Sequence, residues 1–412
     1  MDNITHTLIG ALVGEAVAAA TKPAHEGLPR NERRAVFVTA MAIGSNVPDL
    51  DVLYSTVTGS KLDYLLHHRG HTHTFAIAVV IAGLLWLACE RWAKRRGLRL
   101  ASADRMTIVA LCLLAPVLHV LMDLTNSYGV HPFWPFDNRW LYGDAVFIVE
   151  PLLWAAAAPL LFTLRTRIAR SLVALALIIG IGLTFFTGFV PLKLAVAYSV
   201  LVVALVYASS AFSTRGAIAL GIAFWLLVTA CYMGTSRIVA REVSELAAAS
   251  FAQAQALDRV LTPMPVNPLC WEMLLVQREA DDELVVRRGM FALRPDWIAA
   301  TACPNRNLDG PITAPVEPVP LADTPQVAWY GQTRSPLAPL VALWQERCQV
   351  DALMRFVRAP WLAQTRAGLV VGDARYDREA ELGFAELSLD KDDQRCPRWM
   401  PPWQAPRADL LR

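Results

Sequence analysis

Charged residues are almost absent from four long stretches of this 412-residue chain. The stretches are 106–122, 171–192, 194–213 and 217–236. Each approaches the roughly 17–25 residues that a helix needs to cross a bilayer core. Hydrophobic residues make up 55% of the chain and its mean hydropathy is +0.37, which excludes an ordinary soluble protein. The net charge of +2 gives no indication of a nucleic-acid partner, and we expect none. The sequence therefore predicts an integral membrane protein.

The N-terminus, "MDNITHTLIG", lacks the basic region that opens a cleavable signal peptide, so none is expected. Eight apolar segments follow along the chain: 8–20, 35–43, 75–89, 106–122, 145–164, 171–190, 194–212 and 217–234. The first two are too short to be assigned as complete spans. They can be tilted, re-entrant or buried among longer helices, so six to eight membrane segments are predicted.

Lysine and arginine are distributed unevenly between the connecting loops. One set of alternate loops contains fourteen: Lys22, Arg30, Arg33, Arg34, Arg91, Lys94, Arg95, Arg96, Arg99, Arg105, Arg165, Arg167, Arg170 and Arg215. The other set contains four: Lys61, Arg69, Arg139 and Lys193. Because basic loops stay in the cytoplasm, the first set is predicted to be cytoplasmic. The N-terminus, the histidine-rich loop and the C-terminal tail then face the extracytoplasmic side.

The tail after about residue 235 differs in composition from the apolar segments. It contains 17 of the 26 prolines, and "WEMLLVQREADDELVVRRGMFAL" is typical of a strand, a turn and a second strand. "LVALWQERCQVDALMRFV" has helical spacing, whereas "GLVVGDARYD" and "FAELSLD" indicate strands. We therefore predict an all-α multi-span membrane bundle over residues 1–236 and an extramembrane α+β domain over 237–412.

The seven cysteines divide between these two regions. Cys89, Cys112 and Cys231 lie in apolar runs, where a small core residue is expected. The remaining four, Cys270, Cys303, Cys348 and Cys396, lie in the tail. They can form disulfides if that domain faces an oxidising compartment.

Histidines and acidic residues interrupt or border the apolar segments. They are His6, Asp49 and Asp51 of "GSNVPDLD", the loop "HHRGHTHT" at 67–74, His119 and Asp123 of "HVLMD", and Glu150. In the predicted topology all of them lie at the same, extracytoplasmic end of the bundle. His119 and Asp123 are four residues apart, so they share one helix face. Imidazole and carboxylate groups gathered at one membrane face predict a metal site, and these ligands suit zinc, manganese or iron.

Each of these features also has a simpler interpretation. His119 can be a hydrogen-bonded core histidine, and Asp49 and Asp51 can cap a helix. The four-histidine loop can be a pH-sensitive surface, and Glu150 can be a lone intramembrane proton carrier. Their convergence on one membrane face favours the metal site over these alternatives.

Several of the motifs, in order, resemble a known family. They are "MDNITHTLIG", "GSNVPDLD", "HHRGHTHT", "HVLMDLTNSYGVHPFWPF" and "FIVEP". The chain resembles, over about residues 1–151, the membrane-bound metal-dependent hydrolases described as LexA-binding and inner-membrane-associated. "NPLCWE" and "GDARYD" are similar to the C-terminal extension of the longer members.

The resemblance implies a set of metal ligands and supporting residues. The implied ligands are His6, Asp49, Asp51, His68, His73, His119 and Asp123. Arg69, Thr72, Asn126, Tyr128 and Gly129 are implied as supporting positions. Family members commonly have aspartate where this chain has Glu150, and they do not require histidine at positions 67 and 71.

These observations predict an integral-membrane, metal-dependent hydrolase of the bacterial cytoplasmic (inner) membrane. One or two divalent ions, with zinc preferred, would activate water against an ester or phosphoester. Arg69 would stabilise anionic charge, and Asp51 or Glu150 would act as general base. The site's location favours a membrane lipid or another amphiphilic substrate, reached from the extracytoplasmic side. Two other classes remain open: a metal-ion transporter, and a regulatory or scaffold protein with a structural metal. The partner of the C-terminal domain is not predicted.

Overall fold

The computed structural model describes residues 1–22, 27–305, 310–390 and 395–411. The chain divides into two compact units. The first unit consists of Met1–Leu50, His71–Phe136 and Val146–Tyr232. The second consists of Asp51–Gly70, Asp137–Ala145 and Met233–Arg412. The predicted boundary after residue 236 falls inside a continuous helix and stays a prediction.

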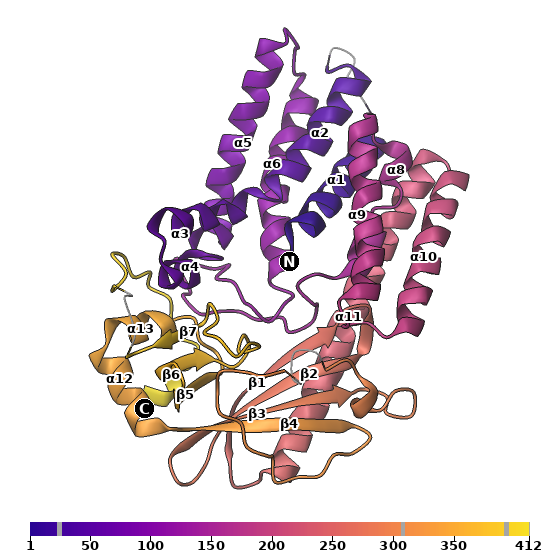
Figure 1. The fold of residues 1–412 in the computed structure, drawn as a ribbon. Coiled ribbons are helices and arrows are strands. Elements are labelled where there is room, and N and C mark those ends of the chain that lie inside the picture. Colours follow the sequence, from indigo (N-terminus) through magenta and orange to yellow (C-terminus); the bar gives the residue numbers. More distant parts are fainter. Residues whose placement is uncertain (23–26, 306–309, 391–394, 412) are drawn as a thin grey trace. The chain divides into compact units, whose positions relative to one another are not determined.

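The first unit is helical, as predicted (Figure 1). Its elements are α1 (Asn3–Ala20), α2 (Arg30–Gly44), η1 (Val47–Asp51), η2 (His71–His73), α5 (Phe75–Arg95), α6 (Ser102–Asp123), α7 (Pro151–Ala155), α8 (Leu160–Thr163), α9 (Arg167–Phe186), α10 (Leu192–Ala211) and most of α11 (Thr214–Ser250). In the described residues six helices are long and apolar enough to cross a membrane: α1, α5, α6, α9, α10 and α11. A seventh span results if the bent pair 30–44 and 47–58 crosses as one.

The apolar segment over 145–164, predicted as one helix, is broken in the structure. Glu150 caps α7 and Pro151 opens it, so no helix precedes residue 151. Pro159 then lies at the start of α8, where a backbone N–H would have no acceptor within that helix. The whole helical stretch Pro151–Thr163 is shorter than a span. By contrast, α1 is longer than predicted, because Asp2 caps it at Thr5 and lets it begin at Asn3.

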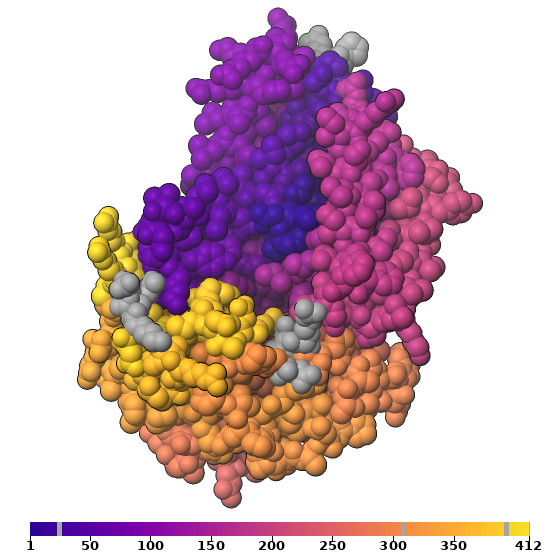
Figure 2. Space-filling model, viewed as in Figure 1, coloured from indigo at the N-terminus to yellow at the C-terminus, as the bar shows by residue number. Residues whose placement is uncertain are grey.

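Glycines allow the first helices to approach closely. A Cβ on Gly10 or Gly14 of α1 would lie 2.7 Å from the backbone of α2, at Met41 or Val38. A Cβ on Gly44, the last residue of α2, would lie 2.7 Å from the Cβ of Ala115 in α6. Small residues spaced in this way let helix backbones meet in a membrane. In Figure 2 the indigo atoms of α1 show only between violet and magenta neighbours. This packing brings the ends of α1, α2 and α6 together.

The second unit is an α+β fold, as predicted. Its elements are α3 (Val52–Thr58), α4 (Lys61–His67), β1 (Gln255–Met264), β2 (Asn267–Arg278), β3 (Glu283–Ala292), η3 (Ala300–Ala302), β4 (Val327–Pro336), α12 (Leu337–Glu346), α13 (Cys348–Met354), β5 (Pro360–Thr365), β6 (Gly368–Asp373), β7 (Glu386–Ser388) and η4 (Ala408–Leu411). One antiparallel sheet has the order β1-β2-β3-β4 and the other has the order β5-β6-β7. The strand–turn–strand pattern predicted for "WEMLLVQREADDELVVRRGMFAL" is the β2–β3 hairpin.

Helix α11 continues well past the apolar segment that ends at residue 234. Val239, Val243 and Ala247 recur every fourth residue and are buried against the β1–β4 sheet. Phe251, directly after the helix, packs against the same surface and stacks edge-on with Trp329. The helix therefore changes from an apolar segment to an amphipathic one without a break.

Two disulfides link parts of the second unit. Cys270 of β2 is joined to Cys303, and Cys348 of α13 is joined to Cys396. Cys89, Cys112 and Cys231 are free cysteines, and of the three only Cys112 is fully buried. The sequence left open whether the four tail cysteines pair, and the structure joins all four in two disulfides.

Candidate metal centre

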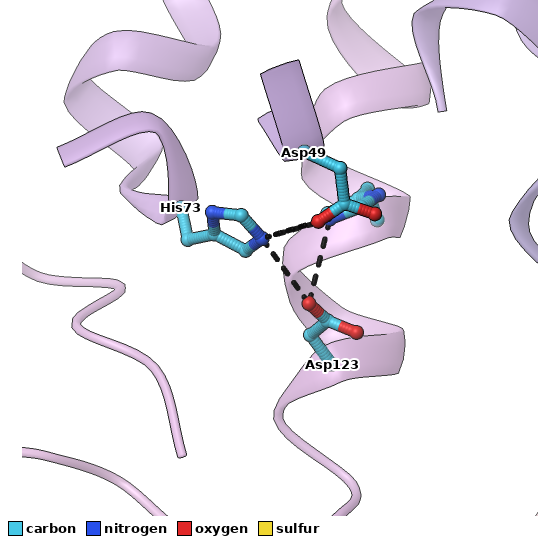
Figure 3. Close-up of side chains that lie close together, drawn as sticks. Asp49, His73 and Asp123 are labelled. Carbon is cyan, nitrogen blue, oxygen red and sulfur yellow. Dashed lines mark hydrogen bonds and ion pairs between the residues drawn. The ribbon is translucent and has the colours of Figure 1, made fainter. Parts of the chain in front are cut away.

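Four predicted site residues of the first unit converge within reach of one ion. Asp49 comes from η1, His73 from η2, and His119 and Asp123 from the last turns of α6. One ligand atom of each lies within 4.8 Å of the others. Figure 3 shows the side chains of Asp49, His73 and Asp123 pointing toward one another. His119 and Asp123 share one helix face, as predicted, and His119 Nε2 lies 3.4 Å from Asp123 Oδ2.

The separations between the ligand atoms match the edges of a coordination polyhedron. His73 Nε2 lies 3.0 Å from His119 Nε2, 3.3 Å from Asp49 Oδ1 and 3.2 Å from Asp123 Oδ2. His119 Nε2 lies 3.5 Å from Asp49 Oδ1. Bonds of about 2.0–2.1 Å to one ion give edges of about 3.3–3.4 Å in a tetrahedron and about 2.9–3.0 Å between neighbouring octahedral positions. The four groups therefore fit a divalent ion in either geometry.

The far nitrogen of each ring is held by a hydrogen bond. His119 Nδ1 lies 2.7 Å from the carbonyl oxygen of Ser45, which can only accept, so this nitrogen carries the proton. His119 Nε2 is then left with a lone pair facing the cluster. His73 Nδ1 lies 3.1 Å from the hydroxyl of Thr72. Metal-bound histidines are typically oriented in this way by a partner on the second ring nitrogen.

His6 adjoins the four residues from α1. Its ring stacks on His119 with centroids 3.8 Å apart, and its Nε2 lies 3.2 Å from Asp123 Oδ1. Among the described residues, its buried Nδ1 has no hydrogen-bond partner. The ammonium group of Met1 also donates to Asp123 and forms a buried ion pair with it. His6 thus holds Asp123 from the side away from His73.

Burial favours a cation at this cluster. His73, His119 and Asp123 are fully buried and Asp49 nearly so. The carboxylates of Asp49 and Asp123 carry two negative charges, of which the buried Met1 ammonium offsets one, and unbalanced charge in a low-dielectric interior is costly. A divalent ion would offset the remaining charge, and the two imidazole nitrogens would bind it. The residues therefore fit a metal ion, and their chemistry alone does not select which one.

Three further predicted site residues lie in the second unit and form a group there. Asp51 Oδ1 lies 3.0 Å from His68 Nδ1, and Asp51 Oδ2 accepts a 3.0 Å hydrogen bond from the backbone N–H of Arg69. Arg69 is buried and adopts a left-handed backbone conformation with φ of 57°. The carboxylate of Asp51 therefore orients His68 and stabilises the turn at Arg69.

Glu150, the remaining predicted residue, has a local structural role. It is fully buried, and its carboxylate accepts a 3.0 Å hydrogen bond from Leu152 N–H as the cap of α7. It does not belong to the group of four. The two histidines that the family does not require lie against aromatic rings. His67 stacks on Trp399 with centroids 5.0 Å apart, and His71 meets Trp134 edge-on at 4.6 Å.

The supporting residues after Asp123 shape the turn that leaves α6. The Asn126 side chain accepts a 2.9 Å hydrogen bond from Tyr128 N–H. Gly129 has φ of 93°, a conformation that side-chain-bearing residues rarely adopt. The carbonyl oxygen of Ser45, which accepts the hydrogen bond from His119 Nδ1, was not predicted from the sequence. The motif "GSNVPDLD" contains this residue, but a search for ligand side chains cannot detect a carbonyl.

These features define a class: a multi-pass membrane helix bundle with a buried two-histidine, two-aspartate cluster that can hold a metal ion, followed by an α+β unit. Residues 1–190 match the family model described as YdjM inner membrane protein. The match and the six apolar helices indicate a multi-pass protein of the inner membrane.

One curated relative is the uncharacterized protein YfhP of Bacillus subtilis (strain 168), 28% identical over 158 residues. The matched region covers 37% of this chain and 43% of the relative, less than half the length of each. No solved structure matches this chain.

Proposed function

We propose that this protein is a metal-dependent hydrolase of an ester or phosphoester bond, acting on a lipid-like substrate from the extracytoplasmic side. The observation that carries the proposal is the buried convergence of Asp49, His73, His119 and Asp123. Held by these four residues, a divalent ion would supply Lewis-acid activation of water and of the scissile bond. We propose zinc as the ion, since imidazole and carboxylate ligands suit it, although manganese or iron would fit the same groups.

The residues of the chain prepare the site for that chemistry. Asp49 and Asp123 provide the negative charge that retains the ion. Ser45 and Thr72 fix the two ligand rings, so little reorganisation is needed when the ion binds. His6, with one ring nitrogen on Asp123, orients that carboxylate and is the nearest additional imidazole for a second ion. Asp51 as general base and Arg69 as the group that stabilises anionic charge remain predictions. Glu150 is the weaker base candidate, because its carboxylate caps α7.

Aromatic residues favour an amphiphilic substrate. The loop after α6 exposes Phe133 and Phe136 in the sequence "HPFWPF". Aromatic side chains gather where a bilayer meets water, and an exposed pair beside the end of α6 suits contact with lipid. A substrate carrying acyl chains could then present its ester group from the bilayer surface.

The disulfides favour an extracytoplasmic second unit. Cys270–Cys303 and Cys348–Cys396 need an oxidising compartment to form and persist. This agrees with the side predicted from the lysine and arginine count. A fusion of alkaline phosphatase after the C-terminus should be active in whole cells, and an inactive fusion would place the unit in the cytoplasm.

The decisive experiment compares His119→Ala with His71→Ala in the purified full-length protein. His71 belongs to the same loop but lies against Trp134 rather than in the cluster. The metal-loaded wild type and His71→Ala should cleave members of an ester and phosphoester panel, including phospholipids in mixed micelles. His119→Ala should lose both the metal and the cleavage. Equal turnover by the two variants would refute the assignment.

A regulatory or scaffold protein with a structural metal is the second candidate. Four protein ligands fill a tetrahedral site, and closed sites of this kind are usually structural. Metal binding without cleavage of any panel member, together with a large loss of stability on chelation, would favour this candidate. A metal transporter is the third, and metal flux into proteoliposomes would identify it.

A further inference from the structure

A second polar site lies in the first unit, at the ends of α1 and α2 opposite the metal centre. A pocket of about 460 Å³ is lined by the end of α1, the start of α2 and the start of α11. His6 and Lys22 are separated by sixteen residues of the α1 segment, roughly 24 Å at helical rise. The pocket is therefore remote from the four-residue cluster.

The lining of this pocket is strongly cationic. Among the described residues it contains Lys22, Arg30, Arg33, Arg34 and Arg215, against a single acidic residue, Glu15. Two of the five cations are neutralised. Arg34 pairs with the buried Glu15 at 2.6 Å, and Arg33 pairs with Asp104 at 2.8 Å. Lys22, Arg30 and Arg215 leave an excess of three positive charges in the lining.

Hydrogen bonds hold several of these side chains in place. Arg33 donates to the backbone carbonyl and the hydroxyl of Thr21, at 3.2 and 2.6 Å. Arg215 Nε donates to the carbonyl of Ala19 at 3.1 Å. The arginines thereby connect the end of α1 to the starts of α2 and α11. Arg33 and Arg34 therefore form an ordered wall, and the exposed side chains of Lys22, Arg30 and Arg215 lie around it.

The direction of the helices adds to the positive potential. Helices α2 and α11 both begin at the pocket, with Arg30 and Arg215 in their first turns. Cations at a helix start are disfavoured by the helix dipole, whereas an anion is stabilised there. A multivalent anion in the pocket would offset both the excess charge and the dipoles. The positive-inside rule explains cations at this membrane face, but it does not require them to line one cavity.

We propose that this pocket binds the phosphate group of an anion, carried either by a phospholipid headgroup or by a soluble phosphate compound. Arginine suits this ligand because its planar guanidinium can donate two parallel hydrogen bonds to phosphate oxygens. Lys22 and Arg30 supply further charge at the entrance formed by α1 and α2. The site is independent of the hydrolase proposal, since none of its residues belongs to the metal centre.

The test measures the thermal unfolding midpoint of the full-length protein in neutral detergent. One arm adds phosphatidylglycerol, with phosphatidylcholine as the uncharged control. The other arm adds inorganic phosphate, with chloride at matched ionic strength. The double variant Lys22→Gln/Arg30→Gln is compared with Arg99→Gln, which removes an exposed cation that does not line the pocket.

The midpoint of the wild type and of Arg99→Gln should rise with the phosphate-bearing ligand. The double variant should need about tenfold more ligand for the same rise, as expected for the loss of charge-assisted hydrogen bonds. A rise with phosphatidylglycerol alone identifies a lipid headgroup, and a rise with inorganic phosphate as well identifies a general phosphate site. Equal responses of the double variant and Arg99→Gln, or no rise above the controls, would overturn the proposal. If the double variant does not fold, Arg30→Gln alone carries the same comparison.

Discussion

Buried carboxylates are neutralised in two different ways in this molecule. In the second unit Arg358 binds Asp144 through two hydrogen bonds of 2.7 and 2.8 Å and also pairs with Asp258. Arg375 pairs with Asp373 at 2.7 Å, and Arg288 pairs with Asp377 at 2.8 Å.

In the first unit the corresponding groups, Asp49 and Asp123, face the imidazoles of His73 and His119. A guanidinium is always charged, whereas an imidazole is mostly neutral at pH 7. Elsewhere in the first unit Glu15 and Asp104 are paired with arginines, as in the second unit. The comparison therefore concerns the cluster itself, where Asp49 and Asp123 meet imidazoles and the Met1 ammonium and, in our proposal, an ion supplies the remaining charge.

The largest expected effect is on metal binding. Asp123→Asn removes a ligand charge from the cluster, so the purified protein should lose its metal almost completely. Asp144→Asn removes a partly buried, ion-paired carboxylate from the second unit and should leave the metal content of the folded protein unchanged. Elemental analysis of the two variants, prepared in parallel, makes the comparison. Similar metal contents in the two variants would contradict the proposed difference between the cluster and the ion pairs of the second unit.

The next effect is on stability. Asp144→Asn leaves the buried guanidinium of Arg358 paired only with Asp258. Breaking a buried pair costs about 3–5 kcal/mol. The second unit should therefore unfold at a lower denaturant concentration. Hydrogen exchange of peptides covering β1 and β5 in the full-length protein would detect this. Wild-type exchange in the variant would show that the ion pair contributes nothing to stability.

A smaller effect is expected from the groups that orient the ligand rings. Thr72→Val keeps the shape of the side chain but removes the hydroxyl that meets His73 Nδ1. Changes of this kind lower metal affinity by about 10–100-fold. Competition with a chromophoric chelator would measure the change, and Thr74→Val, which removes a nearby hydroxyl bonded to the carbonyl of His71, is the control. Equal affinities of both variants would contradict the assigned role of Thr72.

The smallest effect concerns pH. Burial raises the pKa of Glu386, in β7, from its ordinary 4.5 to about 7. The folded state therefore binds this proton more tightly than the unfolded state, and stability falls as the pH rises from 4.5 to 7. Glu386→Gln imitates the protonated form, so the protection of 360–388, meaning exchange relative to the intrinsic rate at each pH, should be similar at about pH 5 and about pH 8. The exposed Glu346→Gln should retain the wild-type pH dependence, and a loss of that dependence in both would exclude Glu386 as its source.

Part of the fold could be predicted from the sequence, and the failures have physical causes. Hydropathy identified the long spans, because lipid-facing helices must be apolar over their whole length. It could not detect the break at Pro159, nor the continuation of α11, whose Val239 and Val243 face a sheet rather than lipid. Strands β1 and β4 were not identified because their sequences mix polar and apolar residues without a strict alternation.

The site shows the same division. Asp49, His73, His119 and Asp123 were among the ligands that the family resemblance implied, and they lie together. The residues themselves predicted that His119 and Asp123 share a helix face and that the histidines and acidic residues gather at one membrane face. That Asp51 pairs with His68, that Glu150 caps α7, and that the Ser45 carbonyl holds His119 all depend on tertiary packing. No one-dimensional pattern contains that information.

The most direct test of the central claim is X-ray absorption spectroscopy of the metal bound to the purified full-length protein. The account predicts a first shell that contains two imidazole nitrogens and carboxylate oxygens in the wild type, and no bound metal in His119→Ala. A protein that retains no divalent metal after purification without chelators and reconstitution, or a first shell that is unchanged in His119→Ala, would contradict it.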